Sequence, residues 1–231
     1  MSAISSKPRR AKAEPAAKAR NVPSGLRRTQ SERSTQTRAR ILAAAATLIS
    51  ARGYARLRTA EVADAAGVSR GAMLHHFPAK AALVVATLTH VFDEARALSR
   101  ARAAAIDPPD DLVAAVIADA REFFFNEHFK VALDIVLSTS TDRATRDQIL
   151  EVSRTARRPV EAAWSAALAD RGVAAPIAAD IVALTLGLVR GMAGRTLWDD
   201  DAEWFEHLFA LWRRMVEAFL ADPALRRGHV A

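Results

Sequence analysis

Apolar residues recur every three to four positions along most of this chain, which is the period of an amphipathic α-helix. The first such run begins after a polar segment and ends at Gly53, with its apolar positions at Ile41, Leu42, Ala45, Leu48 and Ile49. Ser31 or Ser34 is suited to cap the start of this helix, and Gly53 to cap its end.

Two short helices follow in the next 25 or so residues. Thr59 is placed to cap the first, which carries Val62, Ala63 and Ala66 on one face, and Gly67 supplies a left-handed turn at its end. Ser69 is placed to cap the second, which ends near Pro78.

Beyond Pro78 the helical period continues without an alternating run that would indicate a strand. The pattern predicts further helices near residues 79–103, 110–126, 128–139, 143–171, 177–195 and 201–220. Turn-forming residues separate them at 107–111, 138–142, 171–176 and 198–201. We therefore expect an all-α fold.

Charge divides the chain more sharply than its net value of +7 suggests. The net charge is +7 over residues 1–33, +5 over 34–80 and −5 over 81–231. A basic end and a mildly acidic remainder are expected when one end meets a polyanion. Solvated charge without a partner is the alternative that charge alone leaves open.

Composition excludes several kinds of site. The chain has no cysteine, so it has no disulfide, thiolate metal site or cysteine nucleophile, and a reducing cytoplasm is permitted. The longest apolar stretch, 174–189, is interrupted by Asp180 and predicts no membrane segment. Residues 1–30 are expected to form a disordered basic arm, and a secretory signal is not expected, although an organellar transit peptide is compatible with the composition.

Residues 59–80 fit a helix-turn-helix, in which the second helix lies in the major groove of DNA. Gly67 permits the tight turn, Val68 can fill the angle between the helices, and small residues at the start of the second helix leave room for base edges. The candidate DNA-binding residues are Thr59, Ser69, Arg70, Gly71, Ala72, His75, His76 and Lys80.

The same stretch resembles the tetracycline-repressor (TetR) family of bacterial transcription regulators. The matching positions are Thr59, Val62, Ala63, Ala66, Gly67, Val68, Ser69, Gly71, His76, Phe77, Lys80 and Leu83, and the helix before them ends in the similar Gly53–Tyr54. One position departs: Leu74 stands where the family usually has a tyrosine whose hydroxyl often touches a phosphate. Leucine cannot make that contact, so the backbone contacts fall to His75, His76, Lys80 and the arm.

Other interpretations of the polar residues are weaker or remain open. His75 and His76 point about 100° apart on a helix, which suits no shared metal ion, and His76 packed beside Phe77 is as good an interpretation as a phosphate contact. Ligand-pocket candidates in the C-terminal part are His90, Phe124, His128, Trp164 and Arg190. Large aromatic residues at helical spacing are also typical of plain core.

Two C-terminal helices carry features of a dimer interface. Small residues align along one side of the first helix, and the second has a broad apolar stripe; the candidates are Ala183, Gly187, Gly191, Gly194, Phe205, Leu208 and Trp212. The resemblance implies that these helices pair with their copies in a four-helix bundle. Packing within one chain is the alternative.

The sequence thus predicts an N-terminal helix-turn-helix domain, residues 31–80, and a helical ligand-binding and dimerisation domain, residues 81–231. The resemblance implies a cytoplasmic homodimer that represses transcription from a palindromic operator and is released by a small-molecule effector, without a cofactor and without enzymatic activity. The alternatives are a nonspecific DNA-packaging protein and, less favoured, an enzyme. The effector, the operator and the choice between repression and activation stay open.

Overall fold

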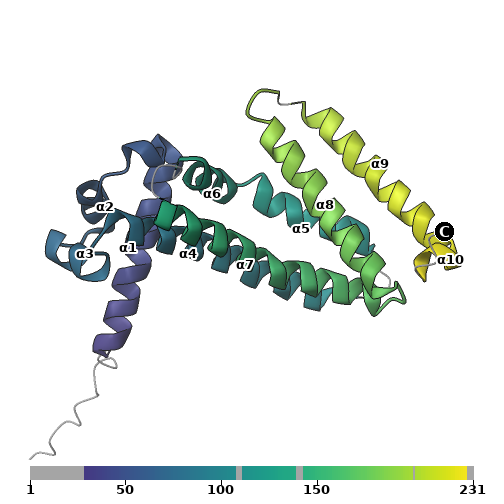
Figure 1. Ribbon diagram of the computed structural model, residues 1–231, viewed down its shortest axis with the longest axis horizontal. Helices are drawn as coiled ribbons and strands as arrows, with labels where there is room; N and C mark the ends of the chain where they lie inside the picture. The colour runs from purple at the N-terminus through teal and green to yellow at the C-terminus, as the bar shows by residue number, and fades with distance from the viewer. Residues whose placement is uncertain (1–28, 108–110, 139–142, 200, 228–231) are drawn as a thin grey trace, which may run out of the picture.

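The computed structural model describes residues 29–107, 111–138, 143–199 and 201–227. The predicted arm (residues 1–28 of it) and parts of three predicted breaks, at 108–110, 139–142 and 200, lie outside the described residues. Within the described ranges all regular elements are helices, so the predicted all-α fold is confirmed (Figure 1). They are α1 (Gln30–Arg52), η1 (Tyr54–Arg56), α2 (Thr59–Ala66), α3 (Arg70–His76), α4 (Lys80–Ala105), α5 (Leu112–Phe124), α6 (Glu127–Ser138), α7 (Arg143–Ala169), α8 (Ala175–Arg195), α9 (Ala202–Ala221) and α10 (Pro223–Arg226).

The start of α1 differs from the prediction. Thr29 is the N-cap: its hydroxyl accepts a hydrogen bond from the Glu32 amide at 3.2 Å, and the Glu32 carboxylate accepts one from the Thr29 amide at 2.7 Å. The prediction of Ser31 or Ser34 as cap is therefore wrong. The reciprocal pair satisfies two free amides at once, which neither serine can do with the residue three positions later.

The turn between α2 and α3 forms as predicted. Gly67 has a φ of 62° in the left-handed region, and the Ser69 hydroxyl accepts a hydrogen bond from the Ala72 amide at 3.1 Å. Thr59, however, does not cap α2. It is the first residue of the helix, and the preceding Arg58 holds the N-cap position with extended backbone and no side-chain cap bond.

The first hydrophobic core joins the helix-turn-helix to three later helices. The predicted apolar faces of α1 and α2 are buried in it, together with Met73 and Phe77 from the end of the turn unit. Beneath them lie residues from α4, α6 and α7, namely Leu83, Val84, Leu88, Val91, Val131, Ala132, Ile135 and Ile149. This first core is thus completed by segments up to 90 or so residues farther along the chain.

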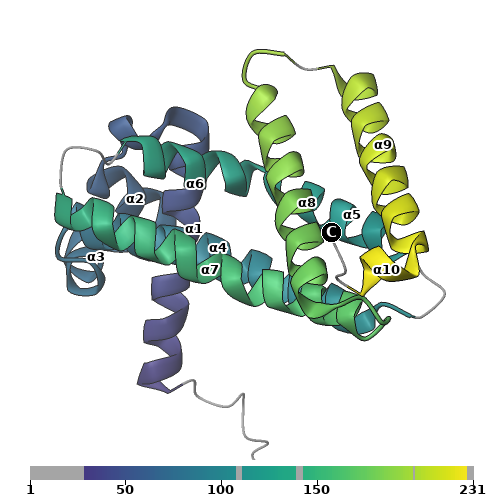
Figure 2. The same cartoon turned by 45° about the vertical axis from the view of Figure 1, so that its right-hand side comes forward.

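A second core occupies the other end of the molecule and is formed by α4, α5, α7, α8 and α9. Helices α4 and α7 lie side by side between the two ends, and α8 and α9 stand at the edge farthest from α2 and α3 (Figures 1 and 2). Over the described residues one helix, α8, is long and apolar enough to cross a membrane, with a mean hydropathy of 1.6. A buried core helix meets the same criterion, and α8 packs against α5, α7 and α9.

Candidate nucleic-acid interface and internal cavity

The short helix α3 buries one side and exposes the other. Met73 and Phe77 are only 1% and 2% exposed, and they anchor the helix in the first core. Gly71 and His75 lie on the opposite side and are exposed, and Arg70 is exposed in the first turn. Two buried apolar residues thus fix α3 in place, and its exposed side carries a glycine near the start of the helix. Such a helix is able to enter the major groove of DNA.

Two arginines on α1 hold this unit in place, and the sequence analysis missed both. The Arg40 guanidinium donates to the Ala66 carbonyl and, at 3.2 Å, to the Gly67 carbonyl, so it satisfies the last carbonyls of α2. The Arg38 guanidinium lies 4.6 Å from the centre of the Phe77 ring. Both arginines stand on α1 just before its apolar positions, where the sequence pattern indicates only charge, and nothing local to them indicates partners 26 residues or more away.

Lys80, at the start of α4, is less free than its sequence position suggests. Its ammonium lies 4.6 Å from the centre of the Tyr54 ring and 3.4 Å from the Tyr54 carbonyl oxygen. Partial burial lowers the pKa of Lys80 below its ordinary value. The side chain remains partly exposed, so its ammonium is placed at the edge of the helix-turn-helix between Tyr54 and solvent.

The departing residue Leu74 lies 49% exposed on α3. The neighbouring His75 is exposed and His76 half-buried, with their ring centres 5.5 Å apart, and the His76 ring lies 6.4 Å from the Phe77 ring. His76 therefore both packs on the core and reaches the surface. Among the described residues no group of three or more histidines, aspartates or glutamates could hold a metal ion.

A cavity of about 900 Å³ opens between α4, α5, α6, α7 and α8. Four phenylalanines on its wall, Phe92, Phe123, Phe124 and Phe129, contact one another with ring centres 5.1 to 6.2 Å apart. A concave, mainly apolar space of this size fits a small organic molecule.

Three of the five predicted pocket residues lie on the cavity wall, namely Phe124, His128 and Arg190. Trp164 is 1% exposed and stands behind the wall, where its indole N–H lies 3.0 Å from the Asp119 carboxylate and 3.1 Å from the Ser99 hydroxyl. His90 does not line the cavity. Its ring lies 3.5 Å from the carboxylate of Glu94, which does line it.

A buried carboxylate on the cavity wall organises the polar groups there. Asp119 has a side chain that is 5% exposed, and it accepts hydrogen bonds from Arg102 at 2.9 Å, from the Trp164 indole and from the Ser99 hydroxyl. Arg102 also pairs with Glu122 at 2.6 Å, and these two carboxylates raise the pKa of the guanidinium. Sequence reasoning missed Asp119, a single acid in an apolar helical run.

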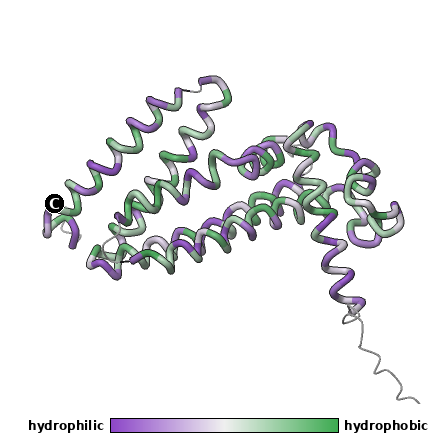
Figure 3. Tube along the Cα trace, turned by 180° about the vertical axis from the view of Figure 1, so that it is seen from behind, coloured by the Kyte–Doolittle hydropathy of each residue, from purple (hydrophilic) through white to green (hydrophobic). Residues whose placement is uncertain are grey.

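Exposed apolar side chains lie on the outer face of α8 and α9 and in the turn that follows α8. Leu184 on α8, Met215 on α9, and Leu197 and Trp198 after α8 are between 56% and 75% exposed, and green segments recur along both helices in Figure 3. A side chain added at Gly187, Gly191 or Gly194 would meet nothing within 4 Å.

The predicted interface residues divide between this face and the protomer interior. Ala183 and Gly191 are exposed, and Gly187, Gly194 and Leu208 are half-buried. Phe205 is 3% exposed because it packs against the Phe125 ring, and the Trp212 indole donates to the Thr185 hydroxyl at 2.9 Å.

A set of polar contacts links the cavity helix α6 to the helix-turn-helix. The Asp134 carboxylate of α6 accepts a hydrogen bond from the Tyr54 amide, and Glu127 at the start of α6 accepts one from the Ser50 hydroxyl of α1. The carbonyl of the same Tyr54 faces Lys80 at 3.4 Å. The Gly53–Tyr54 turn thus contacts both α6 and the start of α4.

Comparisons with known proteins agree with this arrangement. Residues 41–87 match the model of the bacterial regulatory proteins of the tetR family. The HTH-type transcriptional regulator CymR of Pseudomonas putida is 41% identical over 182 residues, which cover 79% of this chain and 90% of that protein.

Solved structures give the same fold. A transcriptional regulator from Rhodococcus sp. Rha1 superposes with a TM-score of 0.60 at 24% identity, over 77% of this chain and 94% of that chain. NalD of Pseudomonas aeruginosa, the secondary repressor of the MexAB-OprM multidrug efflux pump, superposes with a TM-score of 0.52 at 25% identity, over 79% and 96%. The helix-turn-helix, the all-helical remainder and a relative matched over nine-tenths of its length lead to one conclusion: this chain belongs to the TetR family of bacterial transcriptional regulators.

Proposed function

We propose that this chain is a cytoplasmic, homodimeric repressor that binds a palindromic operator and is released by a small-molecule effector. Regulators of this family are not enzymes, and the comparisons give no support to a nonspecific DNA-packaging role. The observation that carries the proposal is the shared helix α4. It begins at Lys80, directly after the helix-turn-helix, and its second half lines the cavity from Phe92 to Arg102.

In this proposal α3 is the recognition helix and reads base edges with Arg70. Its N-cap Ser69, the small Gly71 and Ala72, and the two histidines lie around that contact, and Thr59 at the start of α2 and Lys80 at the start of α4 take phosphates. The functional division then falls at residues 80 and 81. Because Thr29 caps α1 and Gln30 begins it, the arm that adds nonspecific contacts to the DNA backbone comprises residues 1–28 instead of the predicted 1–30.

The effector enters the cavity between α4 and α8. Its phenylalanine-rich wall favours a molecule with an apolar body, and Arg190 and His128 offer polar groups on the same wall. Because α6 also lines the cavity and bonds to Tyr54, a shift of α6 changes the support of the Gly53–Tyr54 turn. An effector that binds one arrangement better than the other shifts the population toward it.

Two copies pair through the outer face of α8 and α9, which buries the apolar side chains that one protomer leaves exposed. Pairing sets the spacing of the two α3 helices, and half-sites about one helical turn apart, near 34 Å, accept only one spacing. A small change in spacing therefore prevents both helices from docking together.

Selection of bound sequences from a random duplex pool tests this function. The expected result is a recurrent inverted repeat with half-site centres about 10 base pairs apart or a multiple of that distance. A library of small apolar molecules is then screened for release of the selected duplex. If the protein bound all duplexes of the pool equally well, that result would contradict the operator-binding proposal and favour DNA packaging instead.

A further inference from the structure

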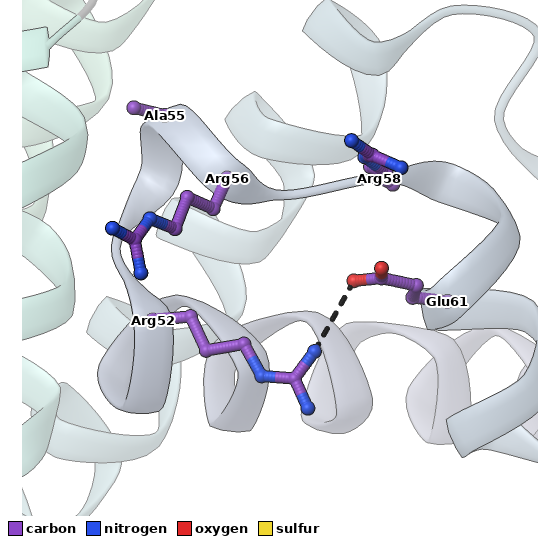
Figure 4. A pocket seen from close by; sticks show the side chains of 5 residues that line it. All are labelled: Arg52, Ala55, Arg56, Arg58 and Glu61. Atoms are coloured by element: carbon purple, nitrogen blue, oxygen red, sulfur yellow. Dashed lines mark hydrogen bonds and ion pairs between the residues drawn. The ribbon is translucent and has the colours of Figure 1, made fainter.

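A second group of arginines lies beside the helix-turn-helix, outside α3. Arg52 at the end of α1, Arg56 in η1 and Arg58 before α2 surround an open hollow of about 550 Å³ together with Ala55 and Glu61 (Figure 4). We call these five residues the arginine hollow. None of them was among the candidate DNA-binding residues of the sequence analysis.

The pairing within the hollow is uneven. Arg52 lies 3.5 Å from the Glu61 carboxylate, and both side chains are about half exposed. Arg56 and Arg58 are exposed, and within the part of the chain that the structure describes neither makes an ion pair. Figure 4 shows their side chains on opposite sides of the hollow, with the Arg52–Glu61 pair below them. Arg52 is thus paired with Glu61, the one acid in the hollow, and the guanidinium groups of Arg56 and Arg58 are available to bind an anion from outside.

Three like charges gathered by one turn repel each other unless an anion binds among them. A guanidinium presents several N–H donors in a plane, which suits the paired oxygens of a phosphate better than a small halide. The chemistry of the hollow therefore fits a phosphate group.

The position of the hollow identifies the source of that phosphate. Arg58 precedes α2, whose eight residues end at the turn before α3. An eight-residue helix is about 12 Å long, and the major groove of B-DNA is about 12 Å wide. When the second helix of a helix-turn-helix lies in the major groove, the first helix crosses the sugar-phosphate backbone, so the arginines beside the start of α2 lie near the wall of the groove that α3 enters.

We propose that Arg56 and Arg58 bind the DNA backbone at one wall of the groove that α3 enters, and that Glu61 weakens this contact. The inference rests on the proposed operator binding, and its experiment separates the two. The contact is electrostatic, so it adds affinity without changing the base preference.

The test measures binding of the double variant Arg56→Gln/Arg58→Gln to two duplexes, one selected from a random pool by the wild-type protein and one with the same bases shuffled. The control is Arg100→Gln, which removes an exposed α4 arginine that makes no ion pair among the described residues. Two lost phosphate contacts per subunit lower the salt slope of log K by about 2 per subunit, so the affinity loss between about 50 and 200 mM salt shrinks roughly a hundredfold for the dimer. The affinity for both duplexes falls alike. Ethylation of phosphates next to the half-sites blocks binding of the wild type, and ethylation of the same phosphates does not weaken binding of the double variant.

Glu61→Gln supplies the opposite change at the same place. Removal of the acid frees Arg52 and tightens binding to both duplexes, with a steeper salt slope. A double variant with the same slope and ethylation pattern as Arg100→Gln would overturn the proposal, as would an unchanged Glu61→Gln. Binding of inorganic phosphate to the wild type, lost in a double variant that binds DNA normally, would assign the hollow to a free anion. If the wild type selects no inverted repeat, it is the operator function that fails.

Discussion

The two ends of this molecule differ in how complete they are within one chain. The helix-turn-helix end has a continuous core in which Ile41, Val62, Leu83, Val84 and Leu88 are fully buried. Between this core and the α8–α9 end lies the cavity of about 900 Å³, and the α8–α9 end leaves Trp198 75% exposed. The first end thus buries its apolar side chains within one chain, whereas the second leaves apolar side chains exposed that the proposed dimer would cover.

This contrast teaches where substitutions act. At the helix-turn-helix end, exposed side chains change what is recognised and buried ones change stability. At the α8–α9 end, exposed apolar side chains are expected to become buried in the dimer, so a surface change there acts on assembly.

The largest effect is expected from Gly187→Leu and Gly191→Leu. A Cβ added at either glycine meets nothing within 4 Å in the protomer, so the fold is expected to persist while the partner helices are pushed apart. Loss of the second half-site contact lowers operator affinity by roughly 10²- to 10⁴-fold. Sedimentation and operator binding are measured beside Ala104→Leu, an exposed α4 position. Dimers that stay intact in both glycine variants would move the interface elsewhere.

Next in size is the effect of Asp119→Ala on stability. The change removes the buried carboxylate that accepts from the Trp164 indole, the Ser99 hydroxyl and the Arg102 guanidinium, so the free energy of unfolding should fall by about 2 to 3 kcal/mol in urea titrations. Glu122→Ala removes the exposed partner of the same arginine and should cost no more than about 0.5 kcal/mol. Equal losses would show that Asp119 does not organise the cavity wall.

A smaller, position-specific effect separates the roles of Arg70 and Lys80. Arg70→Ala should relax base preference at one symmetric pair of operator positions by about 1 to 3 kcal/mol. Lys80→Ala should weaken all sequences alike and reduce the salt slope by about 1 per subunit. Binding profiles over single-base operator variants at two salt concentrations distinguish them, and an unchanged Arg70→Ala profile rules out its base-reading role.

The smallest pair compares two hydroxyl residues of the turn unit. Ser69→Ala removes a cap bond and should lower the free energy of unfolding by about 1 kcal/mol. Thr59→Ala removes no cap bond and should leave stability unchanged while weakening DNA binding through a lost phosphate contact. Thermal melts and duplex binding of both variants check this, and equal destabilisation would restore Thr59 as a cap.

Local rules account for what the sequence predicted well. Gly67 and Ser69 act on amides within a few residues, so their roles follow from their neighbours alone. The Thr29–Glu32 cap obeys an equally local rule through its T-x-x-E spacing, but two serines nearby are also suited to cap a helix, and the predicted arm includes Thr29. The contacts of Arg40 with the end of α2 and of Asp134 with Tyr54 join residues 26 or more positions apart, and no periodicity encodes them. The cavity likewise depends on how five helices pack.

The first hydrophobic core has a consequence for engineering chimaeric regulators. A fragment that ends at residue 80 keeps every residue of the helix-turn-helix but loses Leu83, Val84 and Leu88, together with Val131, Ile135 and Ile149 from α6 and α7. Such a fragment exposes the apolar side chains of α1, α2 and α3 that these residues cover, and it should not fold alone. To exchange DNA specificity between relatives, one can therefore graft the exposed side chains of α3. The alternative is to transfer α1, α2 and α3 together with the segments of α4, α6 and α7 that complete their core.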